Sequence, residues 1–178
     1  MDYTLKKALE ELISAPVTPE KMAKMKDFDW SEYRAEAEMY WEPLDSLEGL
    51  EQAPNLKKIS LDGNHIEDLT PLANMLDLEE IWLYANNVKS VEPLKNLTKL
   101  KTLLLDTNKN LTDISALAHC TSLEYLNISQ TQVTDIQVFQ KLKNLKKLSI
   151  YRTPIDMNKD ENFETLKILA QRGVEIHQ

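Results

Sequence analysis

The strongest constraint on the fold of this chain is an internal repeat of about 22 residues. Five segments, which begin at Leu56, Leu78, Leu100, Leu123 and Leu145, align with one another at spacings of 22, 22, 23 and 22 residues. The additional residue of the third segment falls in "DTNKNL", a turn, where an insertion costs little. A regular period of this length is typical of a solenoid, in which each unit stacks on the next.

Each unit has two halves with different periodicities. The first half has apolar residues at positions 1, 4 and 6, which fits a short strand. The second half has an apolar residue at every third position, as at Ile66, Leu69, Leu72 and Met75, which is the spacing of a 3₁₀ turn or tight helix. One unit cannot bury both apolar edges by itself, so neighbouring units must share one core.

The unit pattern resembles the leucine-rich repeat, in the 22-residue subtype of bacterial internalins and of protein-phosphatase regulatory subunits. The segments "IEDLTPLANM", "LTDISALAHC" and "VTDIQVFQKL" carry the internalin-like part of the resemblance. It implies an α/β repeat fold: a short right-handed leucine-rich repeat solenoid, with a parallel β-sheet on the concave face and 3₁₀ or turn segments on the convex face. It also implies that the concave face is the surface that recognises a protein partner.

The two ends of the chain are predicted to be caps, because a solenoid must cover its terminal apolar faces. We expect a helical N-terminal cap over 1–43, one partial and five full repeats over 44–155, and a helix-strand C-terminal cap over 156–178. In the C-terminal cap, "DENFETLKILAQRG" predicts a helix with Gly173 at its end, and "VEIH" a last short strand.

The N-terminal cap is predicted to be helical in three segments, roughly 2–13, 19–26 and 30–41. Leu44, Leu47 and Leu50 then fit the convex half of a repeat. We expect the helices to replace the strand half of that repeat. A second binding site on these helices is the alternative to a purely capping role.

The position that follows the strand is polar in every unit. Asn64, Asn86 and Asn108 occupy it in the first three units, where a side-chain amide can pair with backbone groups that are freed as the chain turns. Thr131 and Thr153 replace asparagine in the last two units, and their hydroxyls are expected to do this more weakly. The single cysteine, Cys120, falls at a core position and is predicted to be a small buried hydrophobe.

Large aromatic side chains occupy outward positions in the middle of the predicted sheet. Trp82 and Leu104 share one outward column, Tyr84 and Asp106 another, and Tyr125 lies within diagonal reach of Leu104. Tryptophan and tyrosine are enriched at binding hot spots. The predicted partner-binding residues are Lys58, Glu80, Trp82, Tyr84, Leu104, Asp106, Tyr125, Asn127, Tyr151 and Arg152. Two alternatives remain open: a neighbouring loop or helix covers the rings, or they are scattered surface apolars.

The charge of the chain makes a nucleic-acid partner unexpected, since the net charge is −8 and phosphate binding needs a basic surface. Residues 1–55 carry six basic and thirteen acidic side chains, so most of the acidity lies in the N-terminal segment. No stretch approaches the ~20 apolar residues of a membrane span, and one cysteine cannot form an internal disulfide. We therefore expect no membrane partner and a cytoplasmic location.

The sequence carries no pattern of a catalytic or metal site. His65, His119 and His177 fall at unrelated positions of the repeat, and no metal-ligand spacing or phosphate-binding glycine motif occurs. We expect no enzyme activity, no cofactor and no metal. The predicted function is that of a monomeric bacterial module that binds a protein partner as an adaptor or regulator. The alternative is an inhibitor or immunity protein that neutralises a toxin or enzyme by direct binding.

Overall fold

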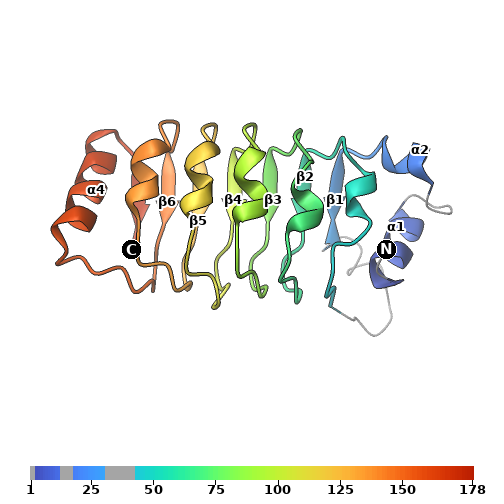
Figure 1. The fold of residues 1–178 in the computed structure, drawn as a ribbon, viewed down its shortest axis with the longest axis horizontal. Coiled ribbons are helices and arrows are strands. Elements are labelled where there is room, and N and C mark those ends of the chain that lie inside the picture. The colour runs from blue at the N-terminus through green and yellow to red at the C-terminus, as the bar shows by residue number, and fades with distance from the viewer. Residues whose placement is uncertain (1–2, 13–17, 31–42) are drawn as a thin grey trace.

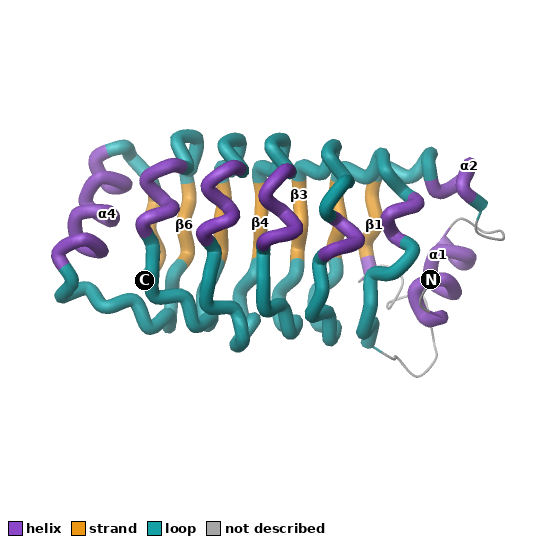
Figure 2. Tube along the Cα trace, in the orientation of Figure 1, coloured by secondary structure: helices purple, strands orange, loops and turns teal. Residues whose placement is uncertain are grey.

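The protein folds into a two-layered solenoid around one parallel sheet, as seen in a computed structural model that describes residues 3–12, 18–30 and 43–178. Seven strands lie in the order β1-β2-β3-β4-β5-β6-β7, so each strand is beside its neighbour in the sequence. The strands form one layer and the short 3₁₀ helices form the other (Figures 1 and 2). The predicted short leucine-rich repeat solenoid is confirmed.

The strands are three residues long. They are β1 (Asp27–Asp29), β2 (Lys58–Ser60), β3 (Glu80–Trp82), β4 (Thr102–Leu104), β5 (Tyr125–Asn127), β6 (Lys147–Ser149) and β7 (Glu175–His177). The middle residue of each of the five repeat strands is fully buried, and the residues on either side are partly exposed apart from Ser60, which is also buried. The alternation follows from the period of two along a strand.

The helical segments are short except at the two ends. The 3₁₀ helices are η1 (Leu50–Gln52), η2 (Thr70–Leu72), η3 (Glu92–Asn96), η4 (Ser115–His119) and η5 (Gln137–Lys141); the α-helices are α1 (Tyr3–Leu12), α2 (Pro19–Met22) and α4 (Asp160–Gln171). None of the helices within the described ranges is long and apolar enough to cross a membrane.

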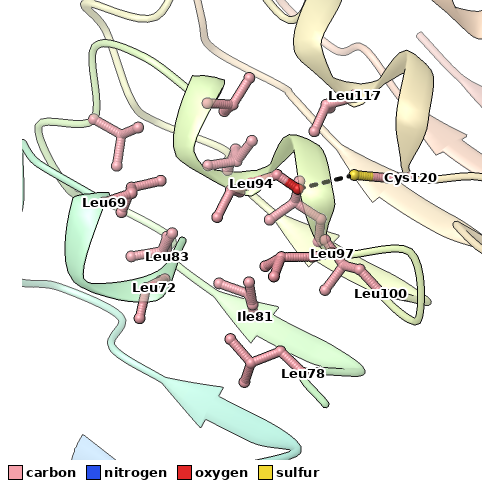
Figure 3. Packing of buried hydrophobic residues seen from close by; sticks show 14 of the residues in the cluster. Leu69, Leu72, Leu78, Ile81, Leu83, Leu94, Leu97, Leu100, Leu117 and Cys120 are labelled. Carbon is pink, nitrogen blue, oxygen red and sulfur yellow. Dashed lines mark hydrogen bonds between the residues drawn. The ribbon is translucent and has the colours of Figure 1, made fainter. Parts of the chain in front are cut away.

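The core runs the length of the solenoid between the two layers. Leucines from the strand half and from the 3₁₀ half of neighbouring repeats meet there (Figure 3). Cys120 belongs to this core and is fully buried, with its Sγ 3.4 Å from the carbonyl oxygen of Leu94. Burial raises the pKa of the Cys120 thiol to about 11, so the thiol stays protonated and unreactive near neutral pH. This confirms the predicted core role.

The asparagines after the strands connect each repeat to the one before it. Asn86 shows the pattern: its Oδ1 accepts from the Ile66 backbone N–H at 3.0 Å, and its Nδ2 donates to the Leu61 carbonyl at 2.8 Å. Asn64 and Asn108 make equivalent bonds to earlier segments or to their own turns. All three side chains are almost fully buried, so these amides satisfy backbone groups that water cannot reach.

The threonines of the last two repeats form fewer hydrogen bonds than the asparagines. Thr131 Oγ1 donates to the Ile128 carbonyl at 2.7 Å, and Thr153 Oγ1 donates to the Ile150 carbonyl at the same distance. Both bonds stay within one repeat. The hydroxyls therefore satisfy a carbonyl of their own turn and no group of the preceding repeat, and their lower strength stays a prediction.

The N-terminal segment supplies a strand, which the sequence analysis did not predict. β1 pairs in parallel with β2, with Phe28 opposite Ile59. Phe28 and Trp30 are buried in the core, and Met25 packs against it. The expectation that helices replace the strand half of the partial N-terminal repeat is therefore wrong. "MKDFDW" carries Met25, Phe28 and Trp30 at the same spacing as positions 1, 4 and 6 of the repeat, with bulkier side chains than leucine.

The predicted helices of this segment are partly observed. α1 spans nearly the range expected for the first helix. α2 is shorter than the predicted 19–26, because the chain turns after Met22 and enters β1. Apart from Trp30, the predicted helix over 30–41 falls outside the described residues.

The C-terminal cap continues both layers. α4 packs against η5, and the Arg172 guanidinium donates to the Leu142 carbonyl. β7 pairs with β6 and extends the sheet by one strand. Gly173 takes a φ of 79°, which is the left-handed conformation expected just after a helix end. Helix, glycine and strand all agree with the prediction.

Candidate functional site

The candidate site is the outward side of the sheet together with the turns that follow its strands, which we call the concave face. Its geometry comes from the strand register. Trp82 pairs with Leu104, and Leu104 pairs with Asn127. Glu80 and Tyr125 flank Thr102 in the neighbouring column. The columns predicted from the repeat alignment are therefore the ones observed.

The turns keep the same alignment beyond the strands. Gly63 N–H donates to the Tyr84 carbonyl at 2.8 Å, and Ala85 N–H donates to the Asp106 carbonyl at 3.0 Å. Tyr84 consequently lies between the turns that carry Asp62 and Asp106. Parallel strands are ~4.8 Å apart, so the backbones of the two aspartates are separated by roughly 10 Å.

The centre of the face is aromatic and only partly buried. Trp82, Leu104 and Tyr125 are half-buried, whereas Tyr84 is 46% exposed. Lysines lie against two of the rings: the Lys58 Nζ is 4.2 Å from the centre of the Trp82 ring, and Lys147 lies similarly over Tyr125. The Trp82 ring thus already holds a cation on its face, an arrangement that is favourable for tryptophan.

The two remaining predicted residues lie apart from this centre. Tyr151 and Arg152 occupy the turn after β6, three strands from Tyr84. Both are exposed, and the Arg152 guanidinium is 5.0 Å from the centre of the Tyr151 ring. At ~4.8 Å per strand, this pair is ~14 Å from the Tyr84 position. The structure therefore divides the predicted set into a central group and a basic C-terminal pair.

Polar side chains at the first turn position after β2, β4 and β5 line up along the face, and an oxygen of one of them accepts no hydrogen bond from the described residues. The Asp62 Oδ1 accepts from the Tyr84 N–H at 2.8 Å, and the Ser129 Oγ accepts from the Tyr151 N–H at 3.1 Å. Asp106 occupies the equivalent place between them. The Ser129 N–H, which would complete the series, donates instead to the Asn127 Oδ1 at 3.0 Å.

The consequence is a group of unsatisfied polar atoms on the concave face. Trp82 Nε1, Asp106 Oδ1 and Thr107 Oγ1 are buried and have no hydrogen-bond partner among the residues that the structure describes. Buried polar atoms in native proteins are nearly always paired, so each exception needs an explanation. All three lie on β3, or on the turn after β4, next to Tyr84.

Burial and repulsion both act on the two aspartates. Partial burial raises the pKa of Asp62, an effect that the Tyr84 N–H opposes and the nearby Asp29 carboxylate reinforces. Partial burial raises the pKa of Asp106 as well, and the Asp62 carboxylate adds to the effect. A cation placed between these groups would relieve the repulsion.

The concave face is electrically asymmetric along the solenoid. Its N-terminal part, from β1 to the turn after β4, carries five carboxylates and two lysines: Asp27, Asp29, Asp62, Glu80, Asp106, Lys58 and Lys109. Its C-terminal part carries Lys147, Arg152 and Glu175, and Lys147 pairs with Glu175 at 3.9 Å. Excess negative charge therefore surrounds the aromatic centre.

Sequence reasoning missed Asp27 and Asp29 as members of this face. The two aspartates were assigned to a helical cap, although they alternate with Phe28 and Trp30 as the outward residues of a strand would. Thr107 has a φ of 63°, which a β-branched residue adopts only with strain and which the sequence pattern does not reveal.

Comparison with known proteins identifies the repeat. The family model described as leucine-rich repeats (two copies) matches residues 77–119 and 121–167. The chain belongs to the leucine-rich repeat family. Proteins with such repeats serve in general as protein–protein interaction modules, and this leucine-rich repeat protein has the fold that supports this use.

Solved structures agree with this leucine-rich repeat fold. An internalin of Listeria monocytogenes matches with a TM-score of 0.67 and 24% identity, covering 93% of this chain and 54% of its own. Internalin C2 of the same organism matches with a TM-score of 0.60 and 26% identity, over 85% of this chain and 76% of that one. A leucine-rich repeat protein of Leptospira interrogans matches with a TM-score of 0.73 and 23% identity, over 92% and 39%.

The leucine-rich repeat chain spans about half the length of the first of these internalins, 54%. A comparison with curated protein sequences gives no match.

Proposed function

We propose that this leucine-rich repeat protein is a non-catalytic binding module that engages a protein partner through its concave face, as an adaptor or regulator. The observation that carries the proposal is the aromatic centre, where Tyr84 is 46% exposed beside the half-buried Trp82 and Leu104. Burying apolar surface contributes roughly 25 cal/mol per Å², and a partner that covers these rings gains this energy.

The size of the sheet limits what it can bind alone. Seven strands at ~4.8 Å spacing give a sheet ~30 Å wide, and strands of three residues are ~10 Å long. A stable interface needs about 800 Å² on each partner, well above the flat area of such a sheet. The turns after the strands, including those at Tyr84 and Tyr151, must therefore contribute.

An inhibitor of a toxin or enzyme is the second candidate function. The excess of carboxylates around Trp82 favours it, because a charged face speeds the encounter with an oppositely charged partner. An inhibitor requires nanomolar or tighter binding with an association rate that falls steeply with salt. An adaptor binds several partners at micromolar affinity with weaker salt dependence. A cytoplasmic location and a monomeric state remain predictions, which cell fractionation and light scattering would check.

The proposed function is tested by capture and then by direct binding. The immobilised protein captures partners from a lysate of its source organism, which mass spectrometry identifies, and each purified candidate is titrated by calorimetry. We expect Trp82→Ala/Tyr84→Ala to weaken binding at least ~30-fold, as truncation of hot-spot residues does. The matched control is Leu76→Ala/Phe163→Ala, which removes two exposed apolar side chains elsewhere on the surface.

Two results bear on this proposal. Binding that the control variant retains and the concave variant loses supports it. Equal binding by all three proteins contradicts it and directs attention to the N-terminal helices. Far-ultraviolet circular dichroism and urea unfolding confirm that each variant is folded, which matters because Trp82 is half-buried.

A further inference from the structure

We propose that the partner of the concave face is a protein segment that presents an arginine to the acidic, aromatic centre formed by Asp62, Trp82, Tyr84 and Asp106. This inference rests on the proposed function and names the chemistry of the partner. It commits to one occupant, a basic peptide segment of another protein. An acidic or purely apolar segment is an outcome of the test.

Charge complementarity is the first argument. The N-terminal part of the concave face has five carboxylates against two lysines, Lys58 and Lys109. Within this part, Asp62 and Asp106 stand on either side of Tyr84 and repel each other. A positive group held over Tyr84 would interact favourably with both carboxylates, whereas a negative group would be repelled by both.

The hydrogen-bond series of the turn column is the second argument. Asp62 and Ser129 each accept a backbone N–H from the following repeat, but Asp106 does not. Its buried Oδ1 receives no hydrogen bond from the described residues, so the Asp106 carboxylate is less well compensated than that of Asp62. A charged donor is the partner that a carboxylate binds most strongly.

The aromatic rings favour arginine over lysine. Lys58 already occupies the face of Trp82 with its Nζ 4.2 Å from the ring centre, which shows that this ring accepts a cation. The Tyr84 ring is exposed beside it. A planar guanidinium stacks on an aromatic ring and donates to a carboxylate at the same time, which an ammonium group cannot do with the same geometry.

The C-terminal part of the face offers a second contact point, which would fix the direction of the bound segment. Tyr151 and Arg152 lie three strands from Tyr84, ~14 Å at ~4.8 Å per strand, which is the length of about four extended residues. Arg152 is exposed and suits an acidic or carbonyl group at that distance. The expected ligand is therefore an extended segment with an arginine over Tyr84 and an acceptor about four residues away.

The test starts from a library of random dodecapeptides displayed on phage. Peptides are selected on the wild-type protein and counter-selected on Trp82→Ala/Tyr84→Ala, so that binders that do not need the aromatic centre are removed. The consensus peptide is synthesised together with a version in which citrulline replaces arginine. Citrulline keeps the shape of arginine and removes its charge.

We expect the selected peptides to contain arginine, and the citrulline version to bind about tenfold more weakly or worse. Asp62→Asn/Asp106→Asn should weaken the arginine peptide by a similar factor, and on this variant the citrulline replacement should have little further effect. Asp113→Asn/Asp135→Asn is the matched control, because it removes the same charge from exposed positions outside the sheet. It should change the affinity less than about twofold.

The outcomes separate the two proposals. Peptides that require Trp82 and Tyr84 but bind equally well with citrulline overturn the arginine inference and leave the proposed function intact. Selection of acidic or purely apolar peptides has the same meaning. If no peptide survives the counter-selection, or every binder ignores the aromatic centre, the arginine inference is overturned, and the capture and titration with Trp82→Ala/Tyr84→Ala decide the proposed function.

Discussion

The first three repeats and the last two are built from the same pattern but are joined differently. The first three, which begin at Leu56, Leu78 and Leu100, place a buried asparagine after the strand. Each asparagine accepts a backbone N–H from the preceding segment, 20 residues earlier. The threonines of the last two repeats bond only within their own turn. The polar residue after the strand therefore decides how strongly a repeat is tied to the one before it.

The inserted residue of the third repeat explains why asparagine gives way to threonine in the fourth repeat. In the regular repeats, the backbone N–H groups of Ile66 and Val88 depend on the asparagine of the following unit. In the longer third repeat, the equivalent Leu111 N–H donates to the Asn108 carbonyl at 3.1 Å within its own turn. The fourth repeat then has no donor to satisfy, so Thr131 is sufficient.

The largest expected effect comes from breaking the asparagine link. Asn86→Ala leaves the Ile66 N–H buried without its acceptor and removes one of two side-chain donors to the Leu61 carbonyl, which keeps Asn64 Nδ2. An unsatisfied buried group costs about 1–3 kcal/mol, so we expect the free energy of unfolding to fall by about 3 kcal/mol. Urea unfolding followed by circular dichroism measures this change.

Thr131→Ala is the matched control from the weaker half. It removes one bond of 2.7 Å to a carbonyl of the same repeat, for which we expect a loss of about 1 kcal/mol. Equal losses for the two variants would show that the asparagines do not tie the repeats together more strongly than the threonines.

The difference between asparagine and threonine was visible in the sequence, and so was most of the fold. Five copies of one pattern fixed the strand positions, the register and the outward columns, since every unit must present the same faces to its neighbours. The insertion at "DTNKNL" was also visible. Its effect on the Leu111 N–H was not, because that bond depends on the path of one turn.

The partial repeat at the N-terminus and the charge of the site were harder to predict. Met25, Phe28 and Trp30 replace the leucines that make the pattern recognisable, so β1 was missed and Asp29 was not assigned to the concave face. The missing donor to Asp106 Oδ1 follows from a competition between two acceptors for the Ser129 N–H. Such a competition is settled by side-chain geometry, which a repeat alignment does not contain.

A smaller effect is expected where the third and fourth repeats differ in backbone strain. Thr107 and Gln130 occupy equivalent turn positions with φ values of 63° and 57°, where the first repeat has Gly63 at 70°. Left-handed backbone costs roughly 1–2 kcal/mol for a residue with a side chain, and most for a β-branched one. We expect Thr107→Gly to stabilise the protein by about 1 kcal/mol in urea unfolding, helped by removal of its unpaired buried hydroxyl.

Gln130→Gly sharpens this comparison between the repeats. Glutamine is not β-branched, and glycine itself costs ~0.5–1 kcal/mol in chain entropy, so we expect a gain of less than about 0.5 kcal/mol. If Thr107→Gly destabilises the protein while Gln130→Gly does not, the threonine side chain contributes a contact that outweighs its strain.

The smallest expected effect concerns the charge that distinguishes the two halves of the concave face. The third repeat has Asp106 where the fourth has Ser129, and burial and the Asp62 carboxylate raise the pKa of Asp106 above 3.8. The folded state therefore binds this proton more tightly than the unfolded state, so ionisation of Asp106 lowers stability as the pH rises through its folded-state pKa. Asp106→Asn should raise the free energy of unfolding at pH 7 by roughly 0.5 kcal/mol, a modest figure because the side chain is partly solvated. The gain should disappear below pH 3.8, where the aspartate is protonated in both states.

Asp77→Asn is the control of opposite sign. The hydrogen bond from Lys99 lowers the pKa of Asp77, so the loss of this bond should slightly destabilise the protein at pH 7. A gain from Asp106→Asn that persists unchanged at low pH would mean that the carboxylate charge is not its cause. In that case the negative charge of Asp106 would carry no stability cost in the folded protein.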